Sequence, residues 1–130
     1  FTNFFGDEKV ASKKLYMNKE ELKFLARRNI LGTHAHMHVP LAKLSPKECV
    51  AEIEESLGVL EELSGSRVKG ISYPFGGKSA VNQTIFSLAE KLGLTYGFTM
   101  ERGINDSKKI NPLALKRIDT NDVPEWIRER

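Results

Sequence analysis

The sequence predicts a single α/β domain in which parallel strands are flanked by helices. Two observations indicate this class: predicted helices and strands alternate along the 130 residues, and short connections join them. This length fits one ordinary domain, whereas a complete eight-unit α/β barrel takes roughly 250 residues. We therefore assign residues 1–130 to one domain. In such sheets, functional sites lie at the C-terminal ends of the strands.

Two helices are predicted in the first half of the chain. Asn18 is a capping residue followed by two glutamates, and apolar residues at positions 22, 25 and 26 form one face. Ser45–Glu48 supplies a capping serine, a proline at the first helical position and a capping-box glutamate. This second helix, over residues 45–63, is expected to be the longest, and Gly65 suits its end. Its buried stripe is expected to comprise Val50, Ile53, Leu57, Leu60 and Leu63.

Strands are predicted between and after these helices. The first is the apolar stretch Ile30–Thr33, which enters a loop, and the second covers Val68–Phe75. Parallel pairing places two unusual segments, His34–His38 and Tyr73–Gly77, at the ends of these strands. The later elements are a helix over 80–92, a strand over 94–100, a loop over 101–111, a strand over 113–118 and a short helix over 123–130.

Composition and charge exclude several classes of protein. Hydrophobic residues make up 40% and charged residues 28%, a globular mixture unlike that of disordered or collagen-like chains. The net charge of +3 is small and basic residues are interspersed with glutamates, so we expect no nucleic-acid partner. The longest apolar run is short, which predicts no membrane span. The single cysteine, Cys49, is expected to be a small buried hydrophobic residue.

All three histidines of the chain lie close together, at His34, His36 and His38. Imidazole is a ligand that suits zinc, iron, cobalt, nickel and copper. If the segment is helical or turn-like, His34 and His38 share a face at i and i+4 and can hold one ion. If it is extended, all three side chains point the same way. A solvated histidine-rich loop, or a phosphate or partner contact, is the alternative without a metal.

The segment Gly32–Leu41 resembles the second motif of the polysaccharide deacetylase family, also called the NodB-homology domain or carbohydrate esterase family 4. That motif reads Gly-Ser/Thr-His-Thr-x-x-His, with a proline and a leucine shortly after. By this resemblance the two metal-binding histidines fall on His34 and His38. His36 occupies a variable position and inherits no role, and Ala35 replaces a common threonine.

The segment Tyr73–Gly76 reads Tyr-Pro-Phe-Gly and resembles the family's third motif. In the family, this motif forms one wall of the substrate groove. The resemblance implies that the backbone N–H of Phe75 stabilises the oxyanion. It also implies a partial (β/α) barrel of the polysaccharide deacetylase type, and it extends over about residues 15–120, including Lys116–Ile118. The substrate-binding residues that it implies are Tyr73, Pro74, Phe75 and Gly76.

The sequence departs from the family at two motifs. The first motif, an Asp-Asp pair that supplies the third metal ligand and the general base, is absent from these 130 residues. The histidine that acts as general acid is absent too, because no histidine follows His38. Ser72 stands where the third motif often has an arginine, and Arg117 is a candidate to supply that charge from another strand. We therefore expect the domain to be incomplete at its N-terminus.

Other polar and aromatic residues each have two interpretations. Tyr73 and Phe75 either stack on a sugar ring or pack in the core. Trp126 is interpreted as a helix residue packed on the core rather than as a sugar platform. The remaining aspartates are candidate carboxylates, although solvated or capping positions are the simpler interpretation: Asp7, Asp106, Asp119 and Asp122.

The resemblance implies metal-dependent hydrolysis of N-acetyl groups on amino-sugar polymers, such as chitin-like chains or peptidoglycan, as part of a longer chain. The implied cofactor is a divalent metal, namely zinc, or cobalt or nickel. The implied partner is a polysaccharide or oligosaccharide of N-acetylated amino sugars. Family members are often extracellular or at the cell envelope, but no leader in this chain indicates a compartment. Whether this chain is itself an enzyme stays open, because the base and acid motifs are missing.

Two other functions remain as alternatives. One is a catalytically inactive, deacetylase-derived domain that binds carbohydrate or acts as a scaffold. The other is a histidine-rich metal-binding module unrelated to sugars. A partial barrel also exposes strand edges and apolar surface, and such surfaces pair with other chains. We therefore also expect self-association.

Overall fold

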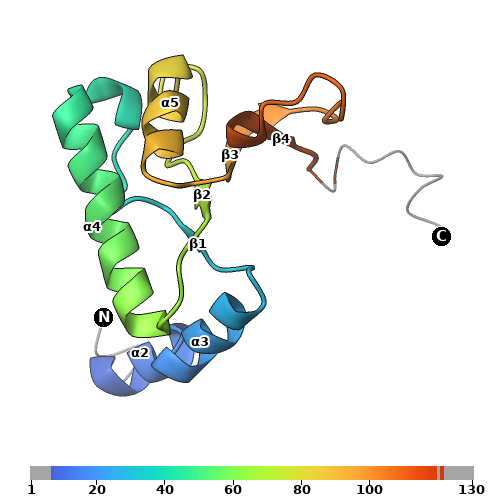
Figure 1. The fold of residues 1–130 in the computed structure, drawn as a ribbon. Coiled ribbons are helices and arrows are strands. Elements are labelled where there is room, and N and C mark those ends of the chain that lie inside the picture. Colours follow the sequence, from blue (N-terminus) through green and yellow to red (C-terminus); the bar gives the residue numbers. More distant parts are fainter. Residues whose placement is uncertain (1–6, 120, 122–130) are drawn as a thin grey trace, which may run out of the picture.

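Four parallel strands form one sheet in the computed structural model, which describes residues 7–119 and residue 121. Figure 1 shows them side by side in chain order. All three strand pairs are parallel, so the expected α/β class is confirmed. The strands are β1 (Gly32–Thr33), β2 (Gly70–Ser72), β3 (Tyr96–Arg102) and β4 (Leu115–Arg117).

The helices precede and connect these strands. They are α2 (Glu8–Leu15), α3 (Lys19–Arg27), α4 (Pro46–Ser64) and α5 (Gln83–Lys91), with 3-10 turns η1 (Leu41–Lys43) and η2 (Pro112–Ala114). At 19 residues, α4 is the longest helix of the described residues, as expected. The sequence did not predict α2, because this helix buries none of its residues and so has no apolar stripe. No helix among the described residues has the length and apolar character to cross a membrane. The helix expected over 123–130, with Trp126, and Asp122 lie outside the described residues.

The predicted helix starts are confirmed by their caps. The Asn18 side chain accepts hydrogen bonds from two N–H groups of the first turn of α3. At α4, the Ser45 N–H donates to the Glu48 carboxylate at 2.8 Å, and the hydrogen bonds from Ser45 hold the pKa of Glu48 below its ordinary value. Gly65 ends α4 in the left-handed conformation with φ 70°.

The buried stripe of α4 keeps Ile53 and Leu57 but differs from the expected one at the other three positions. Cys49 is fully buried, whereas Val50, Leu60 and Leu63 are only half-buried. The reason is helical spacing, since Cys49, Ile53 and Leu57 follow one another at intervals of four on one face. Burial, with a smaller effect of the Glu52 charge, raises the pKa of the Cys49 thiol. The expectation of a buried cysteine is confirmed.

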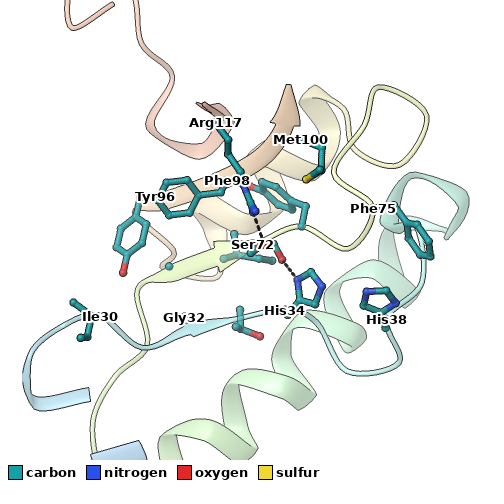
Figure 2. Close-up of a pocket in the computed structure, with 14 residues that line it drawn as sticks. Ile30, Gly32, His34, His38, Ser72, Phe75, Tyr96, Phe98, Met100 and Arg117 are labelled. Atoms are coloured by element: carbon teal, nitrogen blue, oxygen red, sulfur yellow. Dashed lines mark hydrogen bonds between the residues drawn. The ribbon is translucent and has the colours of Figure 1, made fainter. Parts of the chain in front are cut away.

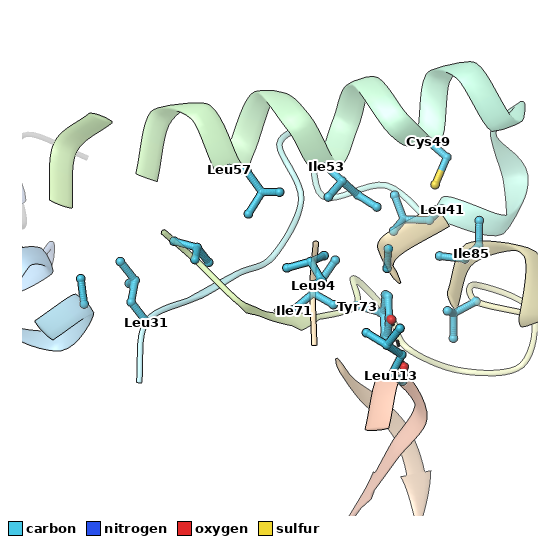
Figure 3. Close-up of a cluster of buried hydrophobic side chains, with 14 residues drawn as sticks. Leu31, Leu41, Cys49, Ile53, Leu57, Ile71, Tyr73, Ile85, Leu94 and Leu113 are labelled. Atoms are coloured by element: carbon cyan, nitrogen blue, oxygen red, sulfur yellow. Dashed lines mark hydrogen bonds between the residues drawn. The ribbon is translucent and has the colours of Figure 1, made fainter. Parts of the chain in front are cut away.

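The hydrophobic core lies between the sheet and helices α4 and α5. Figure 3 shows side chains from α4 pointing toward those of β2 and of the segment before β3. Tyr73 is 1% exposed, its ring lies 5.6 Å from that of Phe86, and its hydroxyl donates to Leu113 O at 2.9 Å. Burial raises the pKa of this hydroxyl above its ordinary value. The core members with the least exposure are Leu41, Cys49, Ile53, Ile71, Tyr73, Ala89 and Leu94.

Strand β3 shows how the two sheet faces differ. Gly97 and Thr99 are buried, while Phe98 and Met100 between and after them are 38% and 57% exposed. This alternation follows from the two-residue period of a strand. One face therefore packs in the core and the other carries accessible aromatic and apolar side chains.

Candidate active site

An open groove of about 700 Å³ lies along the accessible face of the sheet (Figure 2). All four strands contribute to it, and the histidine segment and the turn after β2 border it. The groove thus lies next to both unusual segments of the sequence, His34–His38 and Tyr73–Gly77, as the parallel arrangement predicts. Its lining includes Ile30, His34, His38, Ser72, Phe75, Tyr96, Phe98, Met100 and Arg117.

His34 and His38 converge in this groove. Their ring centroids are 4.9 Å apart, and Figure 2 shows the two imidazoles side by side. The segment is neither a regular helix nor a strand, because Ala35 and His38 adopt left-handed conformations with φ 59° and 54°. His36 points elsewhere, with its Nε2 atom 3.3 Å from the Glu55 carboxylate.

A backbone contact orients the His34 ring. Its Nδ1 atom lies 2.5 Å from the Ser72 carbonyl oxygen. Because a carbonyl only accepts hydrogen bonds, Nδ1 carries the hydrogen, and in the neutral ring Nε2 keeps its lone pair. A hydrogen bond of this kind is the usual support of a histidine that binds a metal through its other nitrogen.

The turn after β2 presents Phe75. This residue has φ 60°, a strained conformation for a side chain other than glycine. None of the hydrogen bonds within the described residues is donated by its N–H, whereas the Gly76 and Gly77 N–H groups donate to Pro74 O and Phe75 O. Its ring is 57% exposed and lies 5.0 Å from the His38 ring. Phe75 therefore lies next to His38 and has a backbone N–H that donates to no described residue.

The other three residues of the motif are buried. Tyr73 packs in the core, as the second of its two interpretations expects, and Pro74 and Gly76 are covered as well. Gly76 has φ 52°, and a Cβ atom there would lie 2.7 Å from the Met100 backbone nitrogen. These residues shape the turn, while the side chain that a substrate in the groove can reach is that of Phe75.

Arg117 reaches Ser72 from β4, two strands away. Its Nη2 atom donates to Ser72 Oγ at 2.6 Å, and its guanidinium lies 5.7 Å from the Phe98 ring centroid. The Nε atom is buried and has no hydrogen-bond partner among the described residues. The structure thus brings the Arg117 cation to the Ser72 side chain.

The described residues contain two candidate metal ligands and no third. No group of three His, Cys, Asp or Glu side chains in residues 7–119 and 121 is arranged to hold a metal ion. Asp7 caps α2, Asp106 accepts from the Lys108 N–H, and Asp119 lies 3.8 Å from Arg102. The two imidazoles suit a divalent transition metal as part of a larger ligand set.

Sequence reasoning missed several residues of the groove. Tyr96, Phe98 and Met100 were predicted only as part of the strand over 94–100, although their alternation with Gly97 and Thr99 indicates one shared face. The contacts of α4 with the histidine segment were also missed, because no local pattern indicates them.

Comparison with known proteins gives consistent matches. The family model described as polysaccharide deacetylase matches residues 1–97. A Bacillus subtilis protein named as a candidate polysaccharide deacetylase, YxkH, is 28% identical over 111 residues, covering 85% of this chain and 38% of its own length. The peptidoglycan-N-acetylmuramic acid deacetylase PdaC of the same organism is 29% identical over 68 residues, covering 52% of this chain and 15% of its own. The chain therefore spans well under half the length of these curated relatives.

Solved structures share the fold. The Streptococcus pyogenes deacetylase PplD superposes with a TM-score of 0.66 at 20% identity, over 90% of this chain and 59% of that one. The BpsB deacetylase domain of Bordetella bronchiseptica gives a TM-score of 0.66 at 17% identity, over 79% of this chain and 48% of its own. The partial barrel expected from the sequence is thus confirmed. Since the family model covers most of the sequence and deacetylases share its fold, the chain belongs to the polysaccharide deacetylase family.

Proposed function

We propose that this domain, as part of a longer chain, hydrolyses N-acetyl groups on an amino-sugar polymer with a divalent metal held by His34 and His38. The observation that carries the proposal is the convergence of these two imidazoles, at 4.9 Å between centroids, with the Phe75 ring 5.0 Å from the His38 ring. Chitin-like chains and peptidoglycan are the candidate substrates. The name of PdaC, a peptidoglycan-N-acetylmuramic acid deacetylase, supports the second of these.

The histidine pair fits a zinc, cobalt or nickel ion. The Ser72 carbonyl accepts a hydrogen bond from Nδ1 of His34, which leaves the other ring nitrogen for a metal. When bound, such an ion polarises the amide carbonyl and lowers the pKa of water to about 7. A third ligand is needed, and we propose that a carboxylate outside these 130 residues supplies it.

Two further groups have roles in this proposal. In this proposal the Phe75 N–H stabilises the oxyanion, and removing a donor of this kind costs roughly 3–4 kcal/mol of transition-state stabilisation. Arg117, held by Ser72 at 2.6 Å, offers the charge that orients a catalytic carboxylate. Its buried Nε–H is the donor available for that carboxylate.

A binding or scaffolding domain without catalysis is the second candidate. The absence of an Asp-Asp pair and of any histidine after His38 favours it, since those residues would transfer the protons. It keeps the groove, with the exposed rings of Phe75 and Phe98 as contacts for sugars.

Release of free amine from acetylated chito-oligosaccharides separates these candidates. We expect very low turnover for the 130-residue chain with added zinc or cobalt, and high turnover for a version extended to include an Asp-Asp segment. A general base and a general acid each contribute roughly 10²–10⁴-fold. Equal turnover in both versions would contradict the proposal that the required carboxylate lies outside these 130 residues. Activity in neither would overturn the enzymatic proposal in favour of the binding domain.

We further propose that the chain self-associates through its β1 edge. At the β4 edge, the Asn105 side chain accepts from the Lys116 N–H at 2.9 Å and donates to Lys116 O at 3.0 Å, which occupies groups that pair with a strand. At the β1 edge, Ile30 is 62% exposed. Light scattering should show a dimer or larger species, and Ile30→Lys should shift it toward monomer. A monomeric native chain at high concentration would contradict this expectation.

A further inference from the structure

The turn that brings His34 and His38 together is strained. Ala35 and His38 have φ 59° and 54°, in a region that residues with a Cβ atom rarely adopt. Such conformations persist only when surrounding contacts fix them. The convergence of the two imidazoles therefore depends on whatever holds this turn.

The carboxylate of Glu52 contacts the backbone of this turn. Its Oε2 atom accepts the N–H of Met37 at 2.8 Å and the N–H of His36 at 3.3 Å. Hydrogen bonds to a charged acceptor are stronger than neutral ones, and consecutive N–H groups of this kind form a concavity that suits an anion. The chain supplies that anion from its own helix α4.

Helix α4 contacts β1 and the histidine segment at three neighbouring positions: Glu52, Glu55 and Ser56. Ser56, one turn after Glu52, lies 2.6 Å from the Thr33 hydroxyl in a buried hydrogen bond. Glu55 lies 3.3 Å from His36 Nε2, so His36 is directed away from the pair. Because Ile53 on the same helix is fully buried, this face of α4 has a fixed position.

We propose that Glu52 is a positioning residue for the His34/His38 pair, acting by fixing the turn in which the two rings converge. It is not a third ligand, since no group of three ligating side chains exists among the described residues. The predicted effect on metal affinity rests on the proposed function. The predicted effect on the turn does not, because it is measured in metal-free protein.

Three variants test this role. Glu52→Ala removes the acceptor, Glu52→Gln keeps an oxygen for the two N–H groups, and Glu54→Ala is a control at an exposed position of the same helix. Two quantities are measured well below each melting temperature: the Co²⁺ affinity, and the nuclear Overhauser effect between the His34 and His38 rings in metal-free protein. Glu52→Ala should lower the affinity about 10–100-fold, as loss of groups that orient metal ligands does, and abolish the Overhauser effect. Glu52→Gln should restore most of both, and Glu54→Ala should match the native chain.

The outcomes are separable. A native Co²⁺ affinity and a native Overhauser effect in folded Glu52→Ala would overturn the positioning role, even if its melting temperature fell. If the native chain bound no Co²⁺, the proposed metal binding by His34 and His38 in this chain would fail, and the Overhauser effect alone would decide the role of Glu52. If Glu52→Ala did not fold, Glu52→Asp would replace it, because the shorter side chain withdraws the carboxylate from the two N–H groups. Native values of both quantities in Glu52→Asp would then overturn the positioning role.

Discussion

Replacing His34 or His38 with alanine is expected to weaken the binding of Zn²⁺ or Co²⁺ by at least about 100-fold, because even groups that merely orient metal ligands contribute 10–100-fold. The two rings lie 4.9 Å apart, so each variant removes one of the two donors that the groove offers. Isothermal titration of chelator-treated protein with Co²⁺ measures the effect.

His36→Ala is the matched control for this prediction. His36 lies in the same turn, but its ring faces Glu55, so its removal should change the affinity only slightly. An equal loss in all three variants would show that binding depends on the histidine-rich composition of the segment and not on the converging pair. If none of the three variants lost metal affinity, the metal would bind at another site.

Gly76→Ala is expected to destabilise the chain by about 2–4 kcal/mol, the sum of a left-handed penalty and a steric one. Gly76 has φ 52°, and an added Cβ would lie 2.7 Å from Met100 N, which itself donates to Gly76 O at 2.9 Å. The turn cannot shift without breaking this hydrogen bond and moving Phe75. Thermal denaturation should show a melting temperature lower by roughly 6–15 °C.

Gly77→Ala is the control for that substitution. An added Cβ at Gly77 meets its nearest neighbour, Phe75 O, at 3.9 Å, an ordinary contact, and the residue lacks a positive φ. Its melting temperature should stay within a few degrees of the native value. If both variants behaved alike, the strained geometry of the Tyr73–Gly77 turn would be wrong.

Local signals predicted most of the fold. The caps at Asn18 and Ser45 determine where α3 and α4 begin, and the residues that form them are adjacent in sequence. Helix α2 also has a capping residue, Asp7, but the helix was missed because it buries no residue and therefore lacks an apolar stripe. The parallel direction of the strands followed from the alternation of elements, since each connection returns the chain to the end of the sheet at which the previous strand began.

The site was predictable only in part. The i and i+4 spacing of His34 and His38 allowed convergence but left an extended segment equally open. In the structure the turn is instead contacted by Glu52, which is distant in sequence and accepts hydrogen bonds from the backbone N–H groups of His36 and Met37. Likewise, Arg117 lies at Ser72 because β3 sets the register between β2 and β4, and no local pattern encodes that distance.

Anomalous diffraction at the zinc edge, on crystals of this chain grown with Zn²⁺, tests the central claim most directly. We predict one strong peak between the imidazoles of His34 and His38, beside the Phe75 turn, and none at His36. A peak at the His36–Glu55 pair, or no peak in the groove at saturating Zn²⁺, would contradict the account.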